Sequence, residues 1–144
     1  MIQSLILTFL LVASAAFSNA QQIFNGENLD GWEGNPALWR VENGSIVGET
    51  TAEKNTDGNT FLIWKGGELG DFTISLKARI TGKNNSGIQY RSKVVDPKKF
   101  VVAGYQMDMH PAPNYLGMLY EEKGRGITAE RGQQVMVDAI DPDT

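Results

Sequence analysis

Five polar side chains recur at alternate positions in two short runs of the sequence, and their types are those of a site. In chain order they are Gln89, Arg91, Gln106, Asp108 and His110. They supply two amides, a guanidinium, a carboxylate and the only imidazole of the chain. Such a set can bind a polar ligand, stabilise a developing negative charge and transfer a proton. We interpret them as a candidate functional site.

Two β-strands are needed to bring these side chains onto one surface. Residues 87–92 and 101–110 both read as strands, and successive side chains on a strand point to opposite faces. Antiparallel pairing would gather the five polar groups on one face. The opposite face would carry Ile88, Tyr90, Tyr105, Met107 and Met109. The alternative is a solvated outer face, which also alternates polar with apolar residues.

The remaining pattern predicts an all-β fold. Asn43-Gly44 lies between the β-prone runs 38–42 and 45–49, and predicts a hairpin with a type I′ turn. Residues 72–80 alternate apolar with polar side chains, which predicts a half-buried strand. The short connection 81–85 predicts that this strand pairs antiparallel with 87–92. Short strands, Gly-rich turns and no amphipathic helix favour a sandwich or barrel.

The ends of the chain suggest export and domain limits. Residues 1–20 carry no charged side chain, and their apolar run is shorter than the ~20 residues of a membrane span. They predict a signal peptide and a secreted or periplasmic protein, with a short anchor helix as the alternative. Residues 21–144 form the predicted domain. The mature chain is expected to have no transmembrane segment.

Charge and cysteine content exclude other classes of protein. The net charge is −4 at pH 7, from 13 basic and 17 acidic residues, and the basic residues form no stripe. Nucleic acid is therefore a poor candidate partner. The chain has no cysteine, so the predicted core, and not disulfides, must hold the domain together.

Four motifs resemble a known family. They are Phe24-Asn25-Gly26 with Leu29-Asp30-Gly31-Trp32, Trp39 to Gly44, Asn84 to Arg91, and Gly104 to Asp108. Each is short, but their combination and order are specific, and the chain resembles the 3-keto-disaccharide hydrolase family over most of residues 22–137. The resemblance implies a concanavalin A-like jelly roll of two antiparallel sheets, whose concave face holds a sugar. It also implies activity on glycosides oxidised at C3.

The sequence also predicts that the chain is truncated at its C-terminus. Residues 135–140 look like a strand just begun. The resemblance implies several further strands, including a Gly-Glu-Trp-Asn type segment that this sequence lacks. An incomplete sandwich would leave an unpaired edge and uncovered core surface.

The implied reaction assigns roles to the candidate residues. A ketone at C3 acidifies the hydrogen on C2, so the C1 substituent can be expelled after proton removal, and water then adds. His110 is the natural candidate for the base, or else a residue that caps the turn before Pro111. Arg91 could stabilise the enolate oxygen or bind sugar hydroxyls. An ion pair with Asp108 across the strands is its alternative, and both can hold together.

Further residues have weaker assignments. Gln89, Gln106, Glu121 and Arg125 are candidates for substrate binding, although Glu121 and Arg125 also fit a solvated charge cluster. Asp108 is a catalytic candidate that could instead ligate a divalent metal with Gln106, His110 or Glu121. The sequence has no zinc-type ligand spacing, so the cofactor is left as unknown. The expected place of five aromatic residues is the core, with stacking on a sugar ring as the alternative: Trp32, Trp39, Trp64, Tyr105 and Tyr120.

Three functions are compatible with the sequence. The leading one is an enzyme that cleaves 3-keto-glycosides (3-keto-disaccharides), with a carbohydrate as its partner. The alternatives are a non-catalytic carbohydrate-binding module on the same fold and an inactive fragment of the enzyme. A binding module would place aromatic rings on the polar face, whereas the alternation puts Tyr90 and Tyr105 opposite Gln89 and Asp108.

Overall fold

The computed structural model describes residues 20–82 and 85–136, and all the regular structure in this part of the chain is β-strand. Eight strands form, and each pairs antiparallel with its neighbours. They are β1 (Trp32–Glu33), β2 (Trp39–Glu42), β3 (Ser45–Gly48), β4 (Ile63–Trp64), β5 (Ser86–Asp96), β6 (Val101–Met109), β7 (Leu119–Glu122) and β8 (Gly126–Ala129). Over the described residues, nothing resembles a helix able to cross a membrane.

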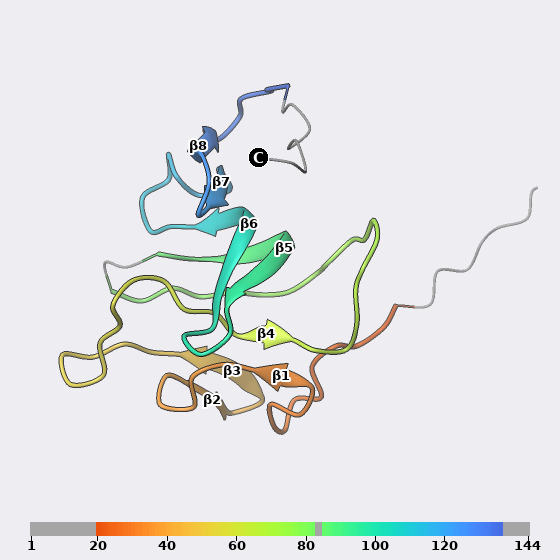
Figure 1. The fold of residues 1–144 in the computed structure, drawn as a ribbon, viewed down its shortest axis with the longest axis vertical. Coiled ribbons are helices and arrows are strands. Elements are labelled where there is room, and N and C mark those ends of the chain that lie inside the picture. Colours follow the sequence, from red (N-terminus) through yellow and green to blue (C-terminus); the bar gives the residue numbers. More distant parts are fainter. Residues whose placement is uncertain (1–19, 83–84, 137–144) are drawn as a thin grey trace, which may run out of the picture.

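The strands form one four-stranded sheet and two ribbons. The sheet has the order β5-β6-β7-β8, and the ribbons are β1-β4 and β2-β3. In Figure 1 the four-stranded sheet lies above the ribbons. The loop before β4 joins the two parts, since Phe61 N donates to Phe100 O at 2.9 Å. The predicted all-β sandwich class is confirmed.

The predicted hairpin at Asn43-Gly44 is confirmed as β2-β3. Asn43 and Gly44 have φ values of 50° and 71°, as a type I′ turn requires. Trp39 pairs with Gly48 across the hairpin, and a Cβ on Gly48 would lie 2.4 Å from the Trp39 ring. The tryptophan therefore packs directly over the glycine backbone.

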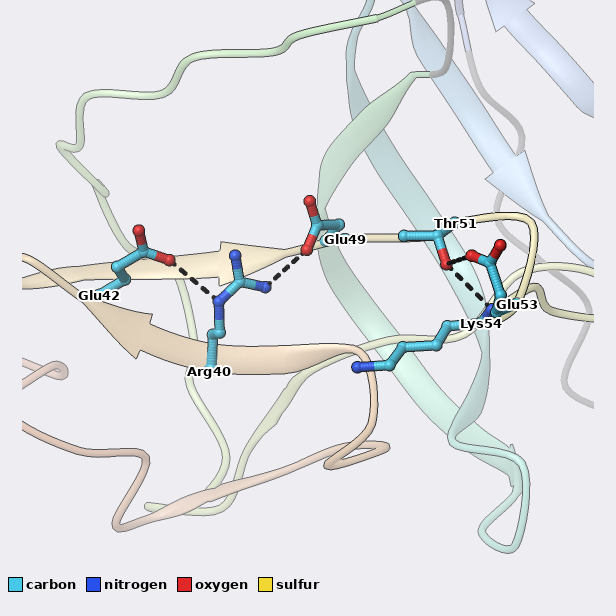
Figure 2. Close-up of polar contacts among 6 residues, drawn as sticks. All are labelled: Arg40, Glu42, Glu49, Thr51, Glu53 and Lys54. Atoms are coloured by element: carbon cyan, nitrogen blue, oxygen red, sulfur yellow. Dashed lines mark hydrogen bonds and ion pairs between the residues drawn. The ribbon is translucent and has the colours of Figure 1, made fainter.

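The exposed side of this hairpin carries a small charge cluster. Figure 2 shows Arg40 between Glu42 and Glu49, with a contact of 3.0 Å to each carboxylate. The hydrogen bond to Glu42 raises the pKa of Arg40, and the hydrogen bond to Glu49 adds a smaller effect in the same direction. Exposed pairs of this kind contribute little to stability, so the hairpin is held mainly by its turn and by Trp39.

Apolar packing is concentrated at a few positions. The buried apolar side chains are Leu38, Val102, Met118 and Ala129. Trp32 pairs with Trp64 in the β1-β4 ribbon, and its indole Nε1 donates to Ile23 O at 3.0 Å. Both tryptophans are half-buried, so neither belongs to the fully buried core in which they were expected.

The predicted strand from Phe72 to Ile80 is wrong. These residues pair with none of the described strands, and β5, their expected partner, pairs only with β6. Phe72, Ile74 and Leu76 are exposed. Alternation favours an extended backbone, but a strand also needs a neighbour to complete its hydrogen bonds. Most of the predicted strand at 135–140 and the predicted signal peptide, except Ala20, lie outside the described residues.

Candidate functional site

The pairing of β5 with β6 brings part of the predicted polar set together. Gln89 lies opposite Gln106, and Gly87 lies opposite Asp108. On the other face, Ile88 pairs with Met107 and Tyr90 with Tyr105. Directly opposed residues share a face, so the predicted separation of the two faces is confirmed for these paired residues.

A chain of hydrogen bonds runs along the polar face and ends at Asp108. Ser92 Oγ lies 2.9 Å from both Gln89 Oε1 and Tyr90 O, two acceptors for its one proton. Gln89 Nε2 donates to Gln106 Oε1 at 3.2 Å. Gln106 Nε2 then donates to Asp108 Oδ1 at 2.7 Å. From the other side, Asn85 Nδ2 lies 3.1 Å from Oδ1 and 3.3 Å from Oδ2 of the same carboxylate. We call Asn85, Gln89, Ser92, Gln106 and Asp108 the Asp108 chain.

Every amide donor in the Asp108 chain points toward the carboxylate. Hydrogen bonds aligned in this way polarise one another and fix the orientation of each amide. Asp108 is 0% exposed and Gln106 is also buried, whereas Gln89 is half-buried. Asp108 therefore positions the amides, and Gln89 and Ser92 carry the chain toward the surface.

Gly87 leaves the space that Gln106 occupies. A Cβ at position 87 would lie 2.4 Å from Gln106 Cγ and 2.8 Å from Met107 O. Gly87→Ala is therefore expected to displace Gln106 and to lower the free energy of unfolding by about 1–3 kcal/mol. Urea denaturation monitored by tryptophan fluorescence measures this change.

Gly70→Ala is the matched control. A Cβ at Gly70 would meet no atom of the described residues within 4 Å, and the residue is outside the left-handed region. We expect its free energy of unfolding to stay within about 0.5 kcal/mol of the wild type. Equal effects of the two substitutions would show that Gln106 does not need the open space at Gly87.

Arg91 does not lie on the predicted polar face with Gln89 and Gln106. The β5-β6 register shifts between Tyr90 and Lys93, and Arg91 adopts a φ of 47° within this bulge. Its guanidinium bonds to Asp71, and the Arg91 side chain is 65% exposed. The predicted alternative, an ion pair with Asp108, is not formed, because the bulge interrupts the alternation that would have carried Arg91 onto the Gln89 face.

His110 lies just beyond β6, which ends at Met109. Its Nδ1 accepts a hydrogen bond from Ala112 N at 2.9 Å, so the turn-capping arrangement is realised. Its ring meets Tyr115 edge-on, with centroids 5.0 Å apart and an interplanar angle of 73°. The ring borders a shallow cleft of about 250 Å³ lined by Ala78, Ile80, Met109, His110, Pro111 and Leu116.

Glu121 and Arg125 lie on the other face of the sheet. Glu121 pairs with Tyr105, and Arg125 donates to the Glu121 carboxylate and to Tyr105 Oη, the latter at 3.1 Å. The bond to Glu121 raises the pKa of Arg125. The tyrosine beside them, Tyr90, has its pKa raised by burial. The sheet thus separates two predicted substrate-binding residues from Gln89, Gln106 and Asp108.

Glu122, and not Glu121, lies on the face of the sheet that carries Gln106 and Asp108. Gln106 pairs with Tyr120, and Gly104 pairs with Glu122, so Glu122 shares the Gln106 face. Glu122 is 4% exposed and accepts a hydrogen bond from Asn59 Nδ2 at 2.7 Å. The loop before β4 therefore reaches the site face through Asn59.

Comparison with known proteins decides the family. A family model described as a 3-keto-alpha-glucoside-1,2-lyase-like domain matches residues 19–140. The chain belongs to this family. The resemblance found in the sequence motifs is thereby confirmed. No curated protein and no solved structure matches the chain.

Several residues of this lyase-like domain were missed by reasoning from the sequence. Asn85, Ser92 and Asn59 all bond to site-face side chains. Asn85 had a usable signal, because it has the same parity as Gly87 and Gln89 and so falls on their face if the strand is extended backward. Asn59 lies in a loop distant in sequence, and no pattern indicates its contact.

The metal hypothesis for this lyase-like domain gains no support from the geometry. Within residues 20–82 and 85–136, no three His, Asp or Glu side chains gather as metal ligands would. Both Asp108 oxygens accept amide N–H groups, which a metal ion would have to displace. The proposed ligands Asp108 and Glu121 also lie on opposite faces of the sheet.

Proposed function

We propose that the chain cleaves 3-keto-glycosides by removing the C2 proton, expelling the C1 substituent and adding water. The observation that carries this proposal is the match of residues 19–140 to the 3-keto-alpha-glucoside-1,2-lyase-like domain. We also propose that the chain is exported before it acts, because residues 1–20 are uncharged and largely apolar.

The proposed reaction needs different catalytic groups from those of ordinary glycoside hydrolysis. The C3 ketone makes the C2 hydrogen acidic, and removing it places negative charge on the C3 oxygen. The enolate then expels the C1 substituent. A base at C2 and a hydrogen-bond donor at the C3 oxygen therefore take the place of two opposed carboxylates.

Three residues suit different roles toward the proposed substrate: Gln89, Arg91 and His110. The amide of Gln89 suits a sugar hydroxyl, because Gln89 is half-buried and the Asp108 chain holds its orientation. Arg91 projects from the bulge and is largely exposed, so it suits a further hydroxyl or the developing oxyanion. His110 supplies an imidazole at the cleft beyond β6.

We expect the chain to release the aglycone from a 3-keto-glucoside and to leave the corresponding unoxidised glucoside intact. Because proton removal precedes loss of the C1 substituent, deuterium at C2 should slow single-turnover release by a primary isotope effect. Chromatography of the aglycone after rapid mixing measures both results. Binding of the 3-keto-glucoside without any release would favour the carbohydrate-binding module instead.

A further inference from the structure

We propose that His110 serves this reaction as a neutral hydrogen-bond donor to the C3 oxygen, and that it is not the base. The inference rests on the proposed function for the identity of the substrate. It rests on the structure for the state of the ring, which is fixed by the contact between Ala112 and Nδ1.

The first step concerns the tautomer of the imidazole. A backbone N–H can only donate, so Nδ1, 2.9 Å from Ala112 N, must accept through its lone pair. A neutral imidazole with an accepting Nδ1 carries its proton on Nε2. Taking up a second proton at Nδ1 would set two N–H groups against each other. His110, which borders the cleft, therefore carries an N–H group at Nε2, where a base would need a lone pair.

The second step concerns the orientation of the ring. Ala112 N holds the Nδ1 edge, and Tyr115 packs edge-on at a centroid distance of 5.0 Å. Contacts on two sides hold the ring before a substrate arrives. A donor that needs no reorganisation is the kind that stabilises charge in a transition state.

The third step concerns the surroundings of the donor. The cleft of about 250 Å³ is bordered by five apolar side chains, Ala78, Ile80, Met109, Pro111 and Leu116. Among the described residues, no other polar side chain lines the cleft, so no second side chain of this part competes with His110 for a ligand there. The volume exceeds the roughly 150 Å³ of a cavity that takes benzene, so one six-membered ring is a reasonable occupant.

The proposed reaction balances without a change in the protonation of His110. The C2–H bond breaks, its proton passes to a water molecule, and its electron pair forms C2=C3 while the C3 oxygen becomes an oxyanion. The Nε2–H group donates to this oxygen. An electron pair on the C3 oxygen then re-forms the C3 carbonyl, and the C2=C3 pair forms C1=C2. The C1–O bond breaks, and the leaving oxygen takes a proton from water. A neutral histidine that polarises a carbonyl is an established catalytic device.

Two substitutions at position 110 separate a donor from a base. Glutamine keeps an N–H donor and has no basic group, whereas glutamate supplies a base and no donor. With a 3-keto-glucoside as substrate, His110→Ala should lower kcat by about 10²–10³-fold. His110→Gln should recover part of this loss, and His110→Glu should not. A glutamate variant more active than the glutamine variant would overturn the proposal.

The tautomer is also measurable without any substrate. His110 is the only histidine of the chain, so a long-range ¹⁵N–¹H correlation spectrum reports on it alone. We expect a neutral ring protonated at Nε2 near neutral pH, and a ring protonated at Nδ1 would overturn the proposal even if the variants fail to fold. A wild type that cleaves no 3-keto-glycoside would contradict the proposed function, while the spectrum would still report the tautomer.

Discussion

Replacing Asp108 with alanine is expected to lower the free energy of unfolding by about 2–4 kcal/mol. Asn85 and Gln106 would both lose a charged acceptor, and each such hydrogen bond contributes about 1.5–3 kcal/mol. Removing a fully buried carboxylate also relieves its desolvation, which offsets part of this loss. Urea unfolding followed by tryptophan fluorescence measures the difference.

Asp108→Asn tests the charge of the acceptor in the Asp108 chain. An asparagine has nearly the same shape, and its oxygen in the place of Oδ1 keeps both donors, Gln106 Nε2 and Asn85 Nδ2. Its amide nitrogen then takes the place of Oδ2, where only the longer contact of 3.3 Å from Asn85 Nδ2 is lost. We expect a smaller loss than for alanine, together with shifted side-chain amide signals of both glutamines.

Asp71→Ala is the control for charge alone. Asp71 is an exposed carboxylate that pairs with Arg91, so its loss should leave the unfolding midpoint nearly unchanged. If Asp108→Ala were as mild as Asp71→Ala, the buried carboxylate would not be what holds the amides. Such a result would also remove the reason to regard Gln89 as fixed for substrate binding.

Strand alternation alone predicts the centre of the site. Gln89, Gln106 and Asp108 lie on one face because a period of two is an inherent property of a paired strand. The Asn43-Gly44 turn is equally local, since positive φ at two successive residues favours that dipeptide. These features need only their immediate neighbours and one correct register.

Features that need a distant partner were predicted less well. Residues 72–80 have the alternation of a strand but no ladder with a described strand, because pairing depends on what lies beside them. Glu121 and Arg125 were grouped with Asp108 by their position in the chain, whereas the β6-β7 register puts Glu121 beside Tyr105. Asn59 reaches Glu122 across 63 residues of sequence.

The placement of Arg91 depends on one glycine in the facing strand. Between the pairs Tyr90–Tyr105 and Lys93–Ala103, two residues of β5 face the single residue Gly104 of β6, which defines a β-bulge. An isolated glycine inside a strand pattern is a recognised signal for such a bulge. Gly104 was therefore a signal in the sequence for the bulge that takes Arg91 off the Gln89 face.

Gly104→Ala is expected to lower the free energy of unfolding by about 3 kcal/mol or more. The new Cβ would lie 2.6 Å from Ser92 Cα and 2.7 Å from Arg91 O, and Gly104 has a φ of 145°. Backbone atoms yield less than side-chain ends, so overpacking and backbone strain both contribute. Denaturation in urea gives the size of the loss, and the amide resonances of Arg91 and Ser92 report whether the bulge rearranges.

Gly117→Ala separates the two causes. Gly117 has a φ of 83°, but a Cβ there would meet no described atom within 4 Å, so only the backbone conformation opposes it. We expect a loss of about 1–2 kcal/mol, smaller than at Gly104. Equal losses at the two positions would mean that close contact with β5 does not stabilise the bulge. The exposed position of Arg91, and with it a role for its guanidinium in binding the substrate, would then need another structural cause.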